Sequence, residues 1–241
     1  MCLYQELGQH WELTLFWNKL GWSLGGFLSL TIARMLADKP FSKVSVAGML
    51  IIDSPYHFAR SKIAQPLADA VISDIPELIQ KSFDNCDIML EHWDLPSWDG
   101  PTLGGKKVTV KSGIKKFELE LGKILHKPLK EQWKVIDHEL HDESSKDKDQ
   151  MEEEGEKREE KPSKPKAPPP GVMIRCVQEV AKAEGAGGQP SLIDLYRHET
   201  MLGWEKNYPD YLKAMIDFDA NHYDVFDKFD QEKVCEILLF L

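Results

Sequence analysis

The sequence has few cysteines and no long hydrophobic run. Its four cysteines, Cys2, Cys86, Cys176 and Cys235, are scattered and form no CxxC pair. This spacing predicts idle or buried thiols in a reducing compartment rather than a disulfide framework. No stretch approaches the roughly 20 consecutive apolar residues that a membrane-spanning helix needs. The sequence therefore does not predict a membrane protein.

The chain also lacks an excess of basic residues and a secretory signal. Acidic residues outnumber basic ones by 40 to 30, which gives a formal net charge of −10. This charge argues against nucleic acid or an anionic membrane as the main partner. Residues 1–6 contain no basic segment leading into an apolar run, so no signal peptide is predicted. We expect a cytoplasmic protein.

The first part of the chain has the pattern of a strand, a helix and a second strand. With 241 residues and 42% hydrophobic content, the chain suits one domain with a real core. Residues 14–17 predict a short buried strand, and residues 27–37 have apolar side chains at helical spacing before Pro40 ends the helix. Residues 44–52 are almost all apolar, as in a strand buried on both faces. This βαβ order predicts a parallel sheet with a right-handed crossover.

The middle of the chain has a different composition. Residues 60–140 are predicted to form a helical subdomain, with one helix opening at 75–79 and another over 117–125. Residues 141–170 consist mainly of Asp, Glu, Lys, Ser and Pro, a composition that cannot bury enough surface to become ordered. We interpret them as a flexible linker. The helical subdomain contains Trp93, Trp98 and Trp133.

The last part of the chain returns to the α/β pattern. Residues 171–177 and 215–218 are strand candidates, and residues 231–241 place apolar side chains on one helical face. The chain thus divides into a first core segment (1–59), a helical insertion (60–140), a linker (141–170) and a second core segment (171–241).

The pentapeptide Gly21-Trp22-Ser23-Leu24-Gly25 has the pattern GxSxG. In this pattern the serine occupies a cramped strand-to-helix turn, where flanking glycines leave room for the neighbouring chain. The turn raises the hydroxyl above the sheet and directs the backbone N–H of the next residue, Leu24, at a developing oxyanion. Because a strand is predicted before it and a helix after it, we interpret Ser23 as a nucleophile.

A serine nucleophile needs a base, and the base needs an acid that orients it. His222 is the candidate base, because it follows a predicted strand late in the chain and the expected order is Ser, Asp, His. Asp53 ends the buried strand after the nucleophile helix, at the sheet edge where such groups gather. Glu179, after the next strand, is an alternative acid. Further alternatives are Asp194, Asp217, Asp219 and Asp224.

Four motifs in the same order resemble the thioesterase domains that end polyketide synthases and non-ribosomal peptide synthetases, most closely the fungal polyketide type. They are GWSLGGF at 21–27, LIIDSP at 50–55, LGW at 202–204 and NHYDVF at 221–226. The resemblance implies an α/β-hydrolase fold, with a mostly parallel sheet and a helical lid over an acyl-binding chamber. It also favours Asp53 over Glu179, because the acid of that family follows the strand after the nucleophile helix.

The resemblance further implies a thioesterase mechanism. An acyl chain on the phosphopantetheine arm of an acyl or peptidyl carrier protein would pass to Ser23. His222, held by Asp53, would act as base, and the Leu24 N–H would bind the oxyanion. Water, a substrate hydroxyl or an enol carbon would then release the product. The chemistry calls for no metal or redox cofactor in the protein itself.

The sequence departs from that family before the nucleophile. Members carry several strands and a second oxyanion donor ahead of the serine, which residues 1–20 cannot supply, so we expect a truncated N-terminus and a sheet without its first strands. One alternative is a carboxylesterase or lipase of the same fold. Another is an inactive fragment kept as a carrier-protein-binding module, with a basic surface on the insertion. Its lysines are Lys106, Lys107, Lys111, Lys115, Lys116, Lys123, Lys127 and Lys130.

Overall fold

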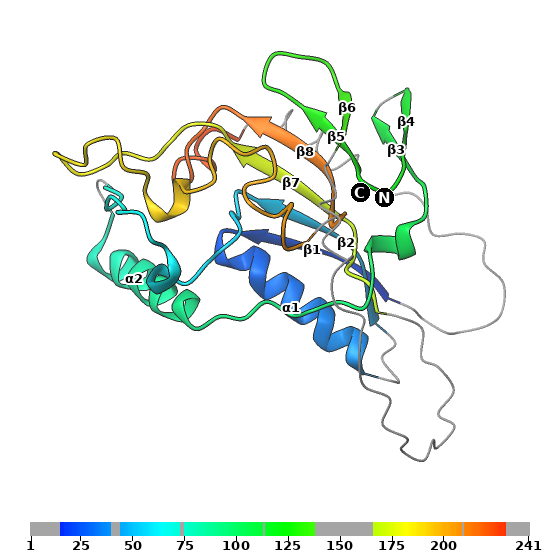
Figure 1. The fold of residues 1–241 in the computed structure, drawn as a ribbon, viewed down its shortest axis with the longest axis horizontal. Coiled ribbons are helices and arrows are strands. Elements are labelled where there is room, and N and C mark those ends of the chain that lie inside the picture. Colours follow the sequence, from blue (N-terminus) through cyan, green and yellow to red (C-terminus); the bar gives the residue numbers. More distant parts are fainter. Residues whose placement is uncertain are drawn as a thin grey trace, which may run out of the picture.

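The computed structural model has a six-stranded sheet in the order β1-β2-β7-β8-β5-β6 (Figure 1). All neighbouring strands are parallel except β5 and β6, which are antiparallel. Its strands are β1 (Leu15–Trp22), β2 (Val44–Ile52), β7 (Gly171–Cys176), β8 (Leu212–Phe218), β5 (Lys123–Lys127) and β6 (Lys134–Asp137). The structure describes residues 15–39, 44–72, 75–112, 114–137, 166–208 and 210–229.

The predicted βαβ unit is present. Helix α1 (Leu24–Asp38) connects β1 to β2 and lies along one face of the sheet (Figure 1). Phe27, Leu30 and Ala33 form its buried face, at the i, i+3 and i+6 positions of the helix. The predicted strands over 44–52, 171–177 and 215–218 correspond to β2, β7 and β8. The result is a mixed α/β structure with a mainly parallel central sheet.

Of the two helices predicted in the insertion, one forms and the other is replaced by strands. Helix α2 (Glu77–Glu91) forms where its opening was predicted. The helix predicted over 117–125 is wrong, because β4 (Lys115–Leu119) and β5 occupy that segment. Strand β3 (Val108–Ser112) pairs with β4 as a hairpin, and its exposure alternates from residue to residue. Such alternation is the period-two signal of a strand, and β5 gains a parallel partner in β8, which is remote in sequence.

Most of the predicted linker lies outside the described residues, as does the helix predicted over 231–241. The end of the linker, from 166 to 170, is described. There the backbone of Lys166 donates to the Asp99 carboxylate, and the Met49 N–H donates to the Pro170 carbonyl oxygen. This part of the linker is therefore attached to the core. No helix in the described part of the chain has the length and apolar character that crossing a bilayer would require.

Because α1 packs closely on β2, substitution by alanine should affect stability differently at two adjacent glycines of the helix. A Cβ atom on Gly26 would lie 2.4 Å from the Ser54 Oγ and 3.0 Å from the Ile51 Cγ2, whereas one on Gly25 would meet nothing within 4 Å. We expect Gly26→Ala to lower the free energy of unfolding by about 1–3 kcal/mol through overpacking. Urea denaturation followed by circular dichroism measures the change.

Gly25→Ala is the matched control. It places the same methyl group in the same helical turn without a clash, and alanine is the better helix former by roughly 1 kcal/mol. We expect this variant to be as stable as the wild type or more so. Equal destabilisation by the two substitutions would contradict the packing argument.

Candidate active site

The three predicted catalytic residues lie at one edge of the sheet. Ser23 follows β1 and Asp53 follows β2, while His222 comes shortly after β8. Because these strands are parallel members of one sheet, their carboxyl ends meet at the same edge. Asp53 and His222 are both almost completely buried. The fold thus brings to one edge residues that are far apart in the sequence, since Ser23 and His222 are separated by 199 positions.

Ser23 has the strained backbone of a tight strand-to-helix turn. Its φ of 51° and ψ of −123° lie outside the regions favoured by non-glycine residues, at a cost on the order of 1–3 kcal/mol. Its N–H donates to the Ile52 carbonyl oxygen at 3.1 Å, and the Ser54 hydroxyl donates to the Ser23 carbonyl oxygen at 2.6 Å. A Cβ on Gly21 would lie 2.3 Å from the Gly25 carbonyl carbon, so only glycine fits there. Neighbouring backbone therefore imposes the turn.

Asp53 orients the imidazole of His222. Its Oδ2 lies 2.8 Å from the His222 Nδ1, and the ring is buried with it. The Cys176 N–H donates to the Asp53 Oδ1 at 2.9 Å, from the end of β7. With Nδ1 bound to the carboxylate, the other ring nitrogen, Nε2, is left for a reacting hydroxyl.

Arg197 is a partner of Asp53 that sequence reasoning missed. The residue is 3% exposed, and its guanidinium donates to both carboxylate oxygens, from Nη1 to Oδ1 at 2.6 Å and from Nη2 to Oδ2 at 3.0 Å. The Arg197 Nε donates to Asp194 at 2.9 Å, so the arginine lies between two buried carboxylates. Its segment, residues 192–200, consists of the short 3-10 helix Leu192–Asp194 followed by turns and a bend, and a lone arginine there gives no periodic or motif signal.

The electrostatic balance keeps Asp53 ionised. Burial opposes its ionisation, but the hydrogen bond from His222 and the charge of Arg197 outweigh burial and hold the pKa of Asp53 below its ordinary 3.8. Asp194 in turn accepts from the Val180 N–H and the Ser191 hydroxyl. A buried arginine paired with two hydrogen-bonded carboxylates satisfies the requirement that buried charges be compensated.

Trp22 packs against the face of the His222 ring. Its indole stacks on the imidazole with the ring centroids 5.1 Å apart and the planes 26° apart, and its Nε1 donates to the His222 carbonyl oxygen at 3.2 Å. Phe226 packs edge-on against the same indole. The side chain between Gly21 and Ser23 in the pentapeptide therefore fixes the position of the base.

Ser23, Leu24 and His222 line one cavity of about 500 Å³. This volume suits a small organic group, since ligand pockets usually range from roughly 300 to 1,000 Å³. Helix α2 supplies part of the wall of this cavity through Phe83, Asp87 and other residues. Burial raises the pKa of Asp87 above its ordinary 3.8.

The alternative acids lie elsewhere or have other partners. Asp194 binds Arg197, and Asp217 forms a bidentate pair with Arg175. Asp219 accepts from the Gln178 amide, and Asp224 accepts from the Asn221 N–H. Glu179 pairs with Lys182. Within the described residues, no group of three or more His, Cys, Asp and Glu side chains is placed to hold a metal ion.

Comparison with known proteins gives relatives of one kind. The chain is 38% identical over 207 residues to a protein named probable thioesterase KK1J from Curvularia clavata, and 34% identical over 224 residues to probable thioesterase lcsE from Purpureocillium lilacinum. It is similar to fungal proteins named thioesterases. The matches cover 86% and 90% of this chain but 62% and 65% of the two relatives, so the chain spans less than two thirds of their lengths. No family model and no solved structure matches it.

Removing Arg197 should leave two buried carboxylates without their shared cation. We expect Arg197→Gln to lower the free energy of unfolding at neutral pH by about 3–5 kcal/mol. The pKa of Asp53 should rise. A carboxylate whose pKa is depressed in the folded state stabilises the fold at pH values above its unfolded pKa, and this stabilisation is lost as the pH falls through the folded pKa. Because the folded pKa of Asp53 is higher in the variant, acid unfolding of the variant should begin at a higher pH. Urea and acid titrations followed by circular dichroism measure both effects.

The control is the double variant Arg197→Gln, Asp194→Asn, which removes one of the two orphaned charges. We expect it to be more stable than the single variant. If Arg197→Gln unfolds outright, Arg197→Lys serves instead, because it keeps a positive charge without the bidentate geometry. Its free energy of unfolding should lie between those of the wild type and Arg197→Gln. A single variant as stable as the wild type would contradict the role given to Arg197.

Proposed function

We propose that the chain is a serine thioesterase that cleaves acyl thioesters through an acyl-enzyme on Ser23. The supporting observation is the buried hydrogen bond between Asp53 and His222, at the cavity that Ser23 also lines. A base held by a carboxylate beside a serine in a strained turn is the arrangement that activates a hydroxyl. The names of the relatives support the substrate class, because both are named probable thioesterases.

In the first half-reaction the Ser23 Oγ attacks the thioester carbonyl carbon while the His222 Nε2 takes the hydroxyl proton. The tetrahedral oxyanion accepts a hydrogen bond from the Leu24 N–H, at the positive end of α1. When the C–S bond breaks, the imidazolium gives its proton to the departing thiolate. The Asp53 carboxylate, kept ionised by Arg197, stabilises the imidazolium throughout.

In the second half-reaction a nucleophile attacks the acyl-serine ester. Water, deprotonated by the His222 Nε2, yields a free acid, and the proton returns to the Ser23 Oγ as the ester bond breaks. A hydroxyl or an enol carbon of the acyl chain itself would instead give a lactone or a ring. The donor in this proposal is an acyl or peptidyl carrier protein, whose phosphopantetheine arm carries the thioester. No metal or redox group is required for either step.

The basic surface considered for such a partner is divided: Lys127 and Lys130, at the end of β5, lie at the same sheet edge as His222, whereas the lysines of residues 106–116 lie away from the site. Residues 106–116 include the β3–β4 hairpin, which precedes β5. Since β5 runs parallel to β8, its start lies at the sheet edge opposite to the one that carries His222. Figure 1 shows the hairpin at the far end of the sheet from α2. A carrier protein that delivers its arm to Ser23 would therefore dock nearer to α2 than to this hairpin.

A fluorophosphonate labelling experiment tests the nucleophile. We expect intact-mass spectrometry to detect one covalent adduct on the wild type and none on Ser23→Ala. The matched control is Ser82→Ala, an exposed serine on α2, which should label like the wild type. A folded wild-type chain that gives no adduct would favour the inactive, carrier-binding alternative.

Paired substrates then separate a thioesterase from a carboxylesterase. The same short acyl group is offered as a thioester and as an oxygen ester, and kcat/KM is measured for each with the wild type and with Asp53→Asn. We expect the thioester to be preferred, and Asp53→Asn to lose on the order of 10⁴ in kcat, as in other serine triads. A preference for the oxygen ester would favour the carboxylesterase or lipase alternative.

A further inference from the structure

Two aromatic rings contact the imidazole of His222. Trp22 stacks on it, and Tyr223 meets it edge-to-face, with the ring centroids 5.1 Å apart and the planes 87° apart. The hydrogen bond to Asp53 holds Nδ1 but does not by itself prevent the ring from tilting about that bond. The two aromatic contacts limit the tilt, and so they set the direction in which Nε2 points.

Phe83 of α2 contacts both of these aromatic rings. The Phe83 and Trp22 centroids are 6.3 Å apart with the planes at 77°, and the Phe83 and Tyr223 centroids are 5.5 Å apart with the planes at 58°. Aromatic pairs at such separations attract each other, and steeply inclined planes are a favoured geometry. Phe83 therefore bridges the two rings that contact the base, from an element that carries none of the three predicted catalytic residues.

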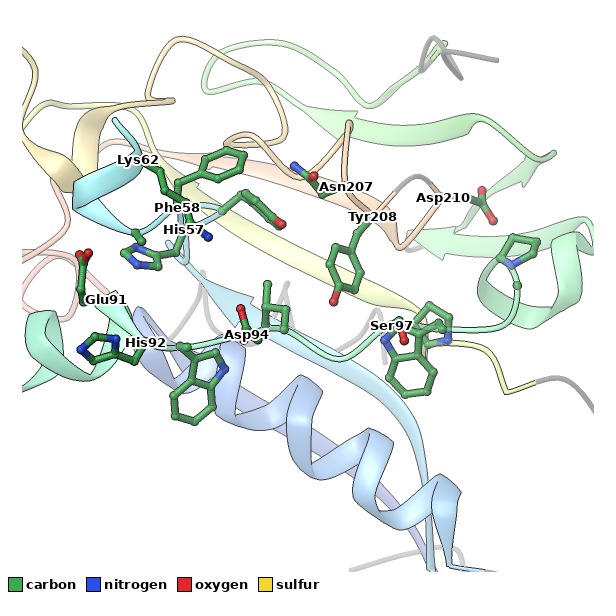
Figure 2. A pocket seen from close by; sticks show the side chains of 18 of the residues that line it. His57, Phe58, Lys62, Glu91, His92, Asp94, Ser97, Asn207, Tyr208 and Asp210 are labelled. Carbon is green, nitrogen blue, oxygen red and sulfur yellow. The ribbon is translucent and has the colours of Figure 1, made fainter. Parts of the chain in front are cut away.

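Helix α2 is bound to the rest of the protein at its C-terminal end. The Glu91 carboxylate accepts from the N–H groups of Arg60 and Ser61, and the Leu90 carbonyl oxygen lies 2.8 Å from the His57 Nε2. Figure 2 shows Glu91 near His57, at one end of a cavity of about 1040 Å³ that both residues line. These contacts fix the place where α2 ends, but they do not fix how its earlier turns lie.

The earlier turns of α2 are joined to the catalytic edge through Phe83. This residue is partly buried and lies two turns, roughly 10 Å, before the contacts that hold the end of the helix. Close to it, Lys81 pairs with Glu77, and the Ser82 hydroxyl donates to the Leu78 carbonyl oxygen, both within the helix itself. The ring contacts of Phe83 thus connect the position of α2 to the position of the base.

We propose that Phe83 is a positioning residue for the catalytic base. It holds Trp22 and Tyr223 against the imidazole, so that the Nε2 of the base points at the Ser23 hydroxyl. The base is then fully oriented only while α2 lies over the cavity, which couples the helix to the chemistry although it supplies no reacting group. This inference rests on the proposed function, because it takes His222 to be the base that deprotonates Ser23.

The rate of fluorophosphonate labelling tests the position of the base. In this reaction the Ser23 Oγ displaces fluoride from phosphorus while the His222 Nε2 takes the hydroxyl proton, and a small alkyl reagent makes little use of the cavity wall. We expect Phe83→Leu, which keeps an apolar side chain but removes the ring, to lower the second-order labelling rate constant roughly tenfold. Phe83→Tyr keeps the ring and should restore the rate to within about twofold of the wild type.

Steady-state kinetics separates positioning from substrate binding, because Phe83 also lines the catalytic cavity. With the propionyl thioester of N-acetylcysteamine, the loss in Phe83→Leu should fall on kcat, while KM changes by less than about twofold. The matched control is Ile88→Ala, which removes an exposed apolar side chain from the same helix and should label and turn over like the wild type. A loss that falls on KM alone would overturn the inference.

A double-mutant cycle tests whether Phe83 acts through Trp22. The labelling rate constants of Phe83→Leu, Trp22→Leu and the double variant are compared with that of the wild type. If Phe83 acts by holding Trp22, its substitution should cost less in the Trp22→Leu background, so the two losses should combine to less than their product. Losses that multiply in full would contradict the proposed role.

The labelling experiment also separates failure of this inference from failure of the proposed function. A wild type that labels no faster than Phe83→Leu would overturn the inference and leave the proposed function intact, whereas a folded wild type that does not label would count against both. If circular dichroism shows that Phe83→Leu does not fold, Phe83→Ala replaces it, because alanine is the best helix former and adds no branched side chain. Its labelling rate constant should fall at least as far.

Discussion

The buried carboxylate of Asp53 is the interaction on which the catalytic edge depends. Its side chain is completely excluded from solvent, so its charge must be compensated inside the protein. The partners come from three separate segments: Cys176 at the end of β7, Arg197 in the turns that follow, and His222 after β8. One charge therefore ties the first core segment to three places in the second. The same contacts that stabilise the fold set the orientation of the base.

The turn at Ser23 is a second constraint, and it depends on the first core segment alone. Gly21 admits the backbone of Gly25, and Gly26 admits the side chain of Ser54, so each of these two glycines allows one close approach. Ser54 also donates to the Ser23 carbonyl oxygen. The residue directly after the catalytic acid thus supports the turn that carries the nucleophile. This contact couples the positions of nucleophile and acid through adjacent residues of the chain.

The sequence was most informative where hydrophobic runs are continuous. The strands β2, β7 and β8 could be predicted because a buried parallel strand needs apolar residues on both faces, and the GxSxG turn between β1 and α1 follows from local sterics. The strands between 108 and 137 could not, because β5 owes its place to β8, far away in sequence. Arg197 was missed for a related reason. Its role comes from two carboxylates that only the fold brings together.

The two ends of the middle segment are anchored very differently. At its end, β5 pairs with both β8 and β6, so the last part of residues 60–140 belongs to the central sheet. At its start, α2 buries only Leu90, whose carbonyl oxygen lies 2.8 Å from the His57 Nε2. Phe83 adds ring contacts to Trp22 and Tyr223 over the catalytic cavity. Because local stability follows buried contact, we expect α2 to be a loosely anchored wall of the cavity that contains Ser23. The nucleophile, acid and base follow strands of the central sheet, whereas Phe83 of α2 is held over the cavity by aromatic contacts.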